Sequence, residues 1–196
     1  MARIFISPSK YIQGPGELTK LGEYTQAYGK SVLVIITAGG LKRSGDVISK
    51  SFEDAKVELH YDNFNGECSQ AEIDRLVQVL DACGAEVVVG VGGGKIFDTA
   101  KAVAATKDLP VIIVPTIAAT DAPCSALSVI YTDEGQFKEY QFFKQNPNLV
   151  LMDTEVIAKS PVRLTVSGMG DALATFFEAR ACQRSDAGTC AGGKVT

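Results

Sequence analysis

The chain has 196 residues, of which 46% are hydrophobic, and its 19 Lys and Arg against 23 Asp and Glu give a net charge of −4. This length allows one ordinary domain and the start of a second, and the hydrophobic content excludes a chain that is disordered throughout. An acidic chain lacks the basic face that nonspecific nucleic-acid binding requires, so we expect no nucleic-acid partner.

The N-terminal segment 1–14 carries no targeting signal that we can identify. Its sequence, MARIFISPSKYIQG, has no apolar stretch long enough for a signal peptide, and no later run approaches the ~20 apolar residues of a membrane helix. The five cysteines are scattered and never stand in C-x-x-C spacing, which favours free thiols in a reducing compartment. We therefore expect a cytoplasmic protein with no membrane partner.

Short runs of β-branched residues predict a parallel sheet. Four runs are apolar on both faces, as the central strands of a sheet covered by helices are. They cover residues 32–36, 87–91, 111–114 and 149–152. A fifth run, 57–61, alternates apolar and polar residues and predicts a strand nearer an edge.

Helical patterns lie around and between these runs. Leu18, Leu21 and Tyr24 are spaced for one helix, and 73–80 carries an apolar stripe for another. Ser69, followed three residues later by Glu72, predicts a capping box that opens the second helix. An Ala-rich stretch, 98–106, predicts a third. This alternation predicts an α/β fold with a Rossmann-like, doubly wound parallel sheet.

The pattern changes after Pro115. Residues 115–126 form a polar loop of small residues, and the runs 128–131 and 137–143 flank a turn that predicts a β-hairpin. From Val162 the chain has a helical pattern, whose apolar face includes Leu173, Phe176 and Phe177. We expect an α/β domain over residues 1–160. Residues 161–196 would be the start of an all-helical domain that is truncated within a loop-like ending.

The stretch 87–101, VVVGVGGGKIFDTAK, resembles a phosphate-binding turn but fits neither common template. A Walker A loop would need glycine at Val89 and Ser or Thr at Ile96, and a dinucleotide fingerprint would need glycine at Lys95. Three consecutive glycines between a strand and a helix still let the backbone approach a diphosphate, where the helix start offers free N–H donors. The alternative is a tight connection with no ligand.

Three motifs in order resemble the glycerol dehydrogenases, a branch of the iron-containing or metal-dependent alcohol dehydrogenase superfamily. They are GGGK-x-x-D-x-x-K over 92–101, PTIAATDAPCSALSVIY over 115–131 and GDALA over 170–174. The resemblance covers essentially the whole chain. It implies a fold shared with dehydroquinate synthase, with the active site between a nucleotide-binding domain and a helical domain. The family forms homo-oligomers, a state that this sequence does not fix.

The resemblance also implies roles for individual residues. Asp121 would touch a small polyol substrate, and Asp171 would ligate zinc, although its stripe with Thr175 and Glu178 would otherwise be an ordinary solvated face. Thr37 stands near the adenosine ribose where the family often has an acidic residue, so the preference for NAD over NADP rests on the resemblance alone. The other residues implied to contact the dinucleotide are Gly92, Gly93, Gly94, Lys95, Asp98, Thr116, Ser125, Leu127 and Tyr131.

The chemistry implied is the oxidation of glycerol to dihydroxyacetone, with hydride transfer to NAD and zinc acting as a Lewis acid on the alcohol oxygen. Catalytic zinc generally needs three protein ligands, which in the family are one aspartate and two histidines. The single histidine, His60, falls in an early strand and is expected to be structural. We therefore expect weak or absent turnover by this truncated chain.

Two other functions fit the same residues. One is an NAD-binding module without catalysis, which zinc would not activate. The other is a lyase related to dehydroquinate synthase, which regenerates its NAD and so releases no NADH at steady state. The loop TDAPCS, 120–125, favours the polyol dehydrogenase, but the glycine turn is common to both enzyme classes.

Overall fold

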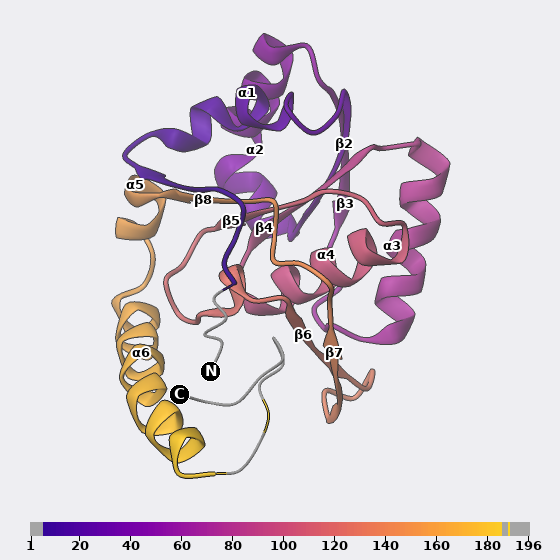
Figure 1. Cartoon of the computed structure of the whole chain (residues 1–196). Coiled ribbons are helices and arrows are strands. Elements are labelled where there is room, and N and C mark those ends of the chain that lie inside the picture. Colours follow the sequence, from indigo (N-terminus) through magenta and orange to yellow (C-terminus); the bar gives the residue numbers. More distant parts are fainter. Residues whose placement is uncertain (1–5, 186–187, 189–196) are drawn as a thin grey trace.

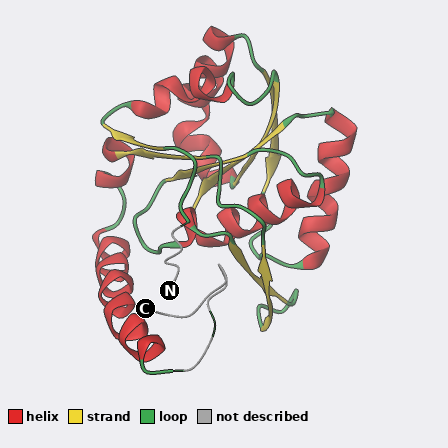
Figure 2. Cartoon of the chain, viewed as in Figure 1, coloured by secondary structure: helices red, strands yellow, loops and turns green. Residues whose placement is uncertain are grey.

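The computed structural model describes residues 6–185 and 188. Its centre is a six-stranded sheet in the order β1-β8-β5-β4-β2-β3, in which every neighbouring pair is parallel. Figure 2 shows the sheet in yellow between red helices. The strands are β1 (Tyr11–Gly14), β2 (Ser31–Ile36), β3 (Glu58–Asn63), β4 (Val87–Gly92), β5 (Val111–Pro115) and β8 (Leu149–Asp153).

The strands that the sequence predicts are confirmed, because the buried ones are apolar on both sides. In β2, β4 and β5 almost every residue is buried, which requires helices on both faces. The alternating run becomes β3, whose residues are only partly buried, and it forms one edge of the sheet. The doubly wound parallel fold is therefore confirmed.

Helices cover the two faces of the sheet in separate groups (Figure 1). On one face α3 (Gln70–Cys83) and α4 (Gly94–Thr106) pack in a cluster that includes Leu76 and Phe97. On the other face the short 3₁₀ helix η1 (Glu17–Lys20), α1 (Leu21–Thr25) and α2 (Ala38–Ala55) pack in a cluster that includes Leu21 and Phe52.

The strand order reverses beside β4. From β2 the chain passes to β3 on one side, whereas from β4 it passes to β5 on the other, and β2 and β4 are direct neighbours with Ile36 opposite Val91. The helices that follow these two strands leave on opposite faces of the sheet. A crevice opens at such a point outside the carboxyl ends of the strands, where open α/β sheets bind ligands.

The predicted hairpin is also present. It consists of β6 (Leu127–Tyr131) and β7 (Phe137–Phe142), which pair antiparallel and extend away from the main sheet (Figure 1). A short 3₁₀ helix, η2 (Ala122–Cys124), precedes the hairpin in the loop that follows β5. Strand β6 lies on the α3–α4 side of the sheet, because Ile130 is buried in that cluster.

The last described elements are α5 (Thr154–Ala158) and α6 (Val162–Gln183). Helix α6 stands beside the sheet and buries none of its residues (Figure 1). Its apolar side chains Val166, Leu173 and Phe176 are each about 60% exposed. No helix among residues 6–185 is both long and apolar enough to cross a membrane.

Three local features differ from the sequence predictions. Helix α2 and strand β1 were not predicted, because α2 begins with Ala38-Gly39-Gly40 and β1 is a short, partly exposed edge. The capping box is only half formed. Ser69 Oγ accepts a bond from the Glu72 N–H at 3.4 Å, but the Glu72 carboxylate turns to Asn65 and Arg75 instead of returning to Ser69.

Candidate functional site

The glycine turn connects β4 to α4 at the strand-order reversal. Gly92 has φ +155°, and a Cβ there would collide with the Ile96 side chain, so the turn requires glycine at this position. Gly93 is the N-cap residue of α4 and supplies no side-chain cap. Gly92, Gly93 and Gly94 are all partly exposed. The first N–H groups of the helix are thus accessible at its positive end, as an anion requires.

Residues at the ends of the neighbouring strands border this turn. Gly92 lies opposite Pro115 in the sheet, and the backbone N–H and hydroxyl of Thr116 both donate to the Gly92 carbonyl, at 2.9 and 3.2 Å. Thr37 follows β2, and its hydroxyl caps α2 by accepting from the Gly40 N–H at 3.0 Å. The structure therefore brings Thr37, Gly92 and Thr116 to the ends of three adjacent strands. The Thr37 and Thr116 hydroxyls already have partners within the protein.

Lys95 projects from the first turn of α4 and contacts two other segments. Its Nζ lies 2.6 Å from Oε2 of Glu67 and 5.7 Å from the centroid of the Tyr131 ring. The other Glu67 oxygen accepts from the Cys68 N–H at 3.0 Å. The Tyr131 N–H donates to the Cys68 carbonyl at 2.8 Å. The loop at 67–68 and the end of β6 thus meet at the Lys95 cation beside the glycine turn.

Asp98 and Lys101 form an ion pair of 2.9 Å inside the protein, with side chains only 11% and 2% exposed. The Lys101 ammonium also donates to the Ala122 carbonyl at 3.0 Å and to the Leu127 carbonyl, and it lies 3.4 Å from Ser125 Oγ. The other Asp98 oxygen accepts from the Val129 N–H at 3.0 Å. Burial raises the pKa of the Asp98 carboxyl, and the Lys101 charge and the Val129 N–H offset only part of this rise.

Asp121 and Asp171 lie next to each other, although they come from different elements. The Asp121 N–H donates to Oδ2 of Asp171, on α6, at 3.0 Å. Helix α6 approaches the loop closely at Gly168, where a Cβ would overlap with the Ala118 carbonyl oxygen. The predicted substrate contact and the predicted metal ligand are thus neighbours, and both residues are exposed.

The described residues do not form a metal site. Among them, no three His, Cys, Asp or Glu side chains are arranged to hold a metal ion. His60 lies on β3, where its Nε2 is 3.2 Å from Oε1 of Glu58. A single carboxylate does not hold zinc by itself, and the other ligands that zinc needs are not found together among the described residues.

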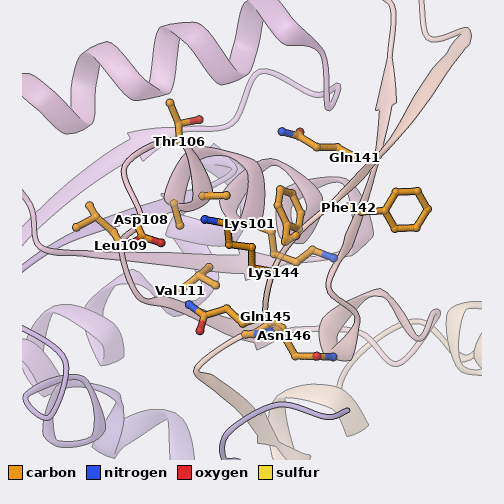
Figure 3. Close-up of a pocket in the computed structure, with 14 residues that line it drawn as sticks. Lys101, Thr106, Asp108, Leu109, Val111, Gln141, Phe142, Lys144, Gln145 and Asn146 are labelled. Carbon is orange, nitrogen blue, oxygen red and sulfur yellow. The ribbon is translucent and has the colours of Figure 1, made fainter. Parts of the chain in front are cut away.

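A pocket of about 550 Å³ lies elsewhere (Figure 3). It is bordered by the last turns of α4, by Val111 at the start of β5, and by the segment 141–147, which covers the end of β7 and the loop after it. Val111 is at the amino end of its strand, whereas the glycine turn is at the carboxyl end of β4. This pocket is therefore separate from the candidate site, although Lys101 contributes to its wall.

The chain matches one known protein family over most of its length. The model of the family described as iron-containing alcohol dehydrogenase matches residues 8–154. This chain belongs to the iron-containing alcohol dehydrogenase family. The match includes the whole sheet from β1 to β8, the glycine turn and the hairpin. The family resemblance drawn from the three sequence motifs is confirmed.

Individual members of the family are similar over the full chain. The glycerol dehydrogenase of Citrobacter freundii is 48% identical over 196 residues, covering 100% of this chain and 54% of that protein. The glycerol dehydrogenase of Escherichia coli O6:H1 is 52% identical, covering 100% of this chain and 53% of that protein. The crystal structure of a probable glycerol dehydrogenase from Sinorhizobium meliloti 1021 has a TM-score of 0.90 at 41% identity, covering 100% of this chain and 54% of that one. The chain spans about half the length of the curated relatives it matches.

Two residues that hold the site together, Lys101 and Glu67, were not predicted from the sequence. Lys101 belongs to the GGGK-x-x-D-x-x-K motif, but an Asp and a Lys three residues apart in a helix are ordinarily an exposed pair, and only the fold shows that this one is buried. Glu67 lies in a loop and becomes visible only through its contact with Lys95. The roles predicted for the cofactor, substrate and metal residues stay predictions.

Proposed function

We propose that this chain is the NAD-binding half of a dehydrogenase that oxidises glycerol to dihydroxyacetone. The observation that carries the proposal is the amino end of α4, which lies at the strand-order reversal with no side-chain cap. Helices α2 and α3 have side-chain caps from Thr37 and Ser69, so their N–H groups are partly satisfied within the chain. The free N–H groups of α4 fit a diphosphate.

The strand order suggests how an extended dinucleotide would lie. Its adenosine would sit over β2 at Thr37, its diphosphate over β4 at the glycine turn, and its nicotinamide beyond β5, near the segment that carries Ser125 and Leu127. Lys95 would add a positive charge beside the diphosphate, and the Tyr131 ring would cover that lysine. Bound there, NAD would accept the hydride that leaves the alcohol carbon, while the hydroxyl proton passes to solvent.

The residues of this chain would orient the substrate. Asp121 lies in the loop after β5, on the side where the nicotinamide would be, and its exposed carboxylate can accept hydrogen bonds from polyol hydroxyls. Asp171 is held beside it through the Asp121 N–H. We propose Asp171 as one ligand of the metal that the family resemblance implies. The other ligands would have to come from outside the described residues.

We further propose the division into a nucleotide-binding domain, residues 1–160, and the beginning of a helical domain, residues 161–196. Two observations support it. The last strand ends at Asp153, and α6 buries none of its residues against the sheet. Residues 186–187 and 189–196 lie outside the described part of the chain. These 196 residues alone are expected to bind NAD but to oxidise glycerol slowly or not at all.

The test uses two measurements. Calorimetry of the 196-residue chain should detect NAD binding, and its absence would contradict the proposal. A hybrid, in which this chain is followed by the remaining part of the Citrobacter freundii relative, should form NADH from glycerol once loaded with metal. The matched Asp171→Asn hybrid should lose this activity while still binding NAD.

Each outcome separates the candidates. A metal-loaded hybrid that binds NAD but does not turn over favours a binding module without catalysis. Steady-state release of NADH would exclude a lyase that regenerates its NAD.

A further inference from the structure

The segment 122–131 is held from one side by α4. The ammonium of Lys101 donates to backbone carbonyls at Ala122 and Leu127, and the Asp98 carboxylate accepts from the Val129 N–H. The Ser128 hydroxyl adds a bond to the backbone carbonyl of Asp98 at 2.8 Å. Four residues of the segment are thus attached to two neighbouring residues of one helix.

The centre of these contacts is a buried pair of charges. The Lys101 ammonium has three donors, and the Asp98 carboxylate and the segment's carbonyls use them. A buried pair of this kind is a weak source of stability, because well-packed apolar residues in its place are often as stable. Its hydrogen bonds do, however, fix the positions of the groups that they connect. The pair therefore specifies where the segment 122–131 lies on α4.

Both oxygens of Asp98 are used in this way. One pairs with Lys101 and the other accepts from Val129. The side chain lies behind the glycine turn, with 8% of the residue exposed, and the first turn of α4 separates it from Gly93 and Gly94. This geometry favours an indirect role for Asp98 over direct contact with a ligand at the turn.

We propose that Asp98 and Lys101 are a positioning pair that sets the cofactor-facing segment 122–131 relative to the glycine turn. The inference rests on the proposed function, because it assumes that Ser125, Leu127 and Tyr131 face NAD. The pair does not touch the cofactor. Its main effect falls on the part of NAD beyond the diphosphate, since the segment reaches the diphosphate end only through the contact of the Tyr131 ring with Lys95.

ADP and NAD distinguish this role from a general loss of structure. ADP contains the adenosine and diphosphate that Thr37 and the glycine turn would hold, whereas NAD also reaches the segment. Losing the pair should therefore weaken the binding of NAD more than the binding of ADP. A loss of folded protein would lower the apparent affinities for both ligands by the same factor.

The experiment measures the Kd of NAD and of ADP by calorimetry on the 196-residue chain. The first variant is Lys101→Met, which removes the ammonium but leaves the Asp98 carboxyl buried without its partner, a change that can unfold the chain. The second is Asp98→Asn with Lys101→Met, which leaves no unpaired buried charge and lacks the Lys101 bonds to Ala122 and Leu127, although the amide oxygen at position 98 can still accept from the Val129 N–H. In both variants we expect the Kd of NAD to rise about tenfold or more, a change that corresponds to about 1.4 kcal/mol of lost binding energy.

Two control variants are needed. One makes the same chemical change at a distant lysine, and the other removes a buried hydrogen bond far from the segment. Lys107→Met removes the same kind of side chain from an exposed pair with Asp81, 2.8 Å apart, at the other end of α4. Ser51→Ala removes a buried bond to the Gly22 N–H of 2.9 Å on the opposite face of the sheet. Both controls should bind NAD and ADP within about twofold of the unmodified chain, as distant sites usually act independently.

The outcomes are separable. If the unmodified chain binds NAD, and both Lys101→Met and the double variant lose NAD affinity while retaining ADP affinity, the positioning role is supported. If the variants bind NAD unchanged, or lose NAD and ADP equally, the positioning role is wrong while the proposed function stands. If the unmodified chain binds neither ligand, the proposed function fails, and the positioning role fails with it.

Discussion

The amino ends of α3 and α4 lie on the same face of the sheet, yet they are completed in opposite ways. At α3 the Ser69 hydroxyl caps the helix, and the buried Glu72 carboxylate accepts bonds from Asn65 and Arg75. At α4 the cap is Gly93, which has no side chain, and the turn before it is partly exposed. Since buried or structural helix ends are satisfied by the chain itself, an end left open at a strand-order reversal indicates a place for a ligand.

The largest expected effect comes from placing a charge at the open end. Gly94→Asp puts a carboxylate at the first position of α4, where it favours the helix but repels a diphosphate. We expect the Kd of NAD to rise by about a hundredfold or more, because like charges placed against each other cost several kcal/mol. The melting temperature of the variant should stay close to that of the unmodified chain. Gly94→Ala is the control, since its Cβ would lie 3.4 Å from Thr120 Cγ2 and adds no charge. Equal NAD affinity in the two variants would contradict the proposed diphosphate site.

At the amino end of α3, which the chain itself closes, a substitution should change the stability of the fold and leave NAD binding unchanged. Glu72→Gln weakens charged bonds from Arg75 of 2.8 and 2.9 Å, so we expect about 1.5–3 kcal/mol less stability at neutral pH and unchanged NAD affinity. Urea unfolding measures this loss. Glu134→Gln, at an exposed position in the hairpin turn, is the matched control and should change little.

The stability lost in Glu72→Gln should depend on pH. Burial alone would raise the pKa of Glu72, but the bonds from Arg75 and Asn65 outweigh it and hold the pKa below its ordinary value. The unfolded chain therefore takes up this proton first as the pH falls. The stability that Glu72 contributes is present above the ordinary glutamate pKa of about 4.3 and is lost as the pH falls through the lower, folded value. The difference between Glu72→Gln and the unmodified chain should shrink over that window, and a constant difference would contradict this assignment.

A smaller effect is expected from the cap itself. Ser69→Ala removes the hydroxyl that accepts from the Glu72 N–H and should reduce stability by about 1 kcal/mol. NAD affinity should stay the same, because α3 does not take part in the proposed diphosphate site. A loss of NAD affinity comparable to that of Gly94→Asp would remove the distinction between the two helix ends.

The smallest effect concerns the ion pair beside the open end. Glu67→Gln removes the negative charge beside Lys95, whose side chain is 54% exposed, and so leaves the lysine charge available to a diphosphate. Because exposed pairs are worth less than about 1 kcal/mol, the Kd of NAD should fall by no more than about fivefold. Calorimetry at low and high salt checks this, since the gain should diminish as salt screens the charge. Weaker binding by Glu67→Gln would show that this glutamate supports the cofactor site.

The sequence was sufficient for every strand of the sheet except the short edge strand β1, because the central strands have an unambiguous pattern. Runs such as 111–114 are apolar on both faces, and only a strand covered on both sides uses such residues. Helix α2 escaped prediction because Gly39 and Gly40 weaken its first turn, although Thr37 stood in place as a cap. Local signals of this kind compete with one another, and tertiary packing decides between them.

The site was predictable only in part, for a different reason. The glycine turn is local, so the strand, the glycines and the helix can be read along the chain. Lys101 and Glu67 act across 26 and 28 residues of sequence, on Leu127 and Lys95, and no local pattern contains such contacts. A lysine in a helix is usually solvated, and only the fold shows that this one is buried among carbonyls.

Amide NMR of the nitrogen-15-labelled chain, titrated with ADP, tests most directly whether the open end of α4 binds a diphosphate. We predict large shifts of the Gly93, Gly94 and Lys95 amide signals, with the Glu72 amide at the closed end of α3 unmoved. Saturable binding of ADP that leaves the three α4 amides in place would contradict this account.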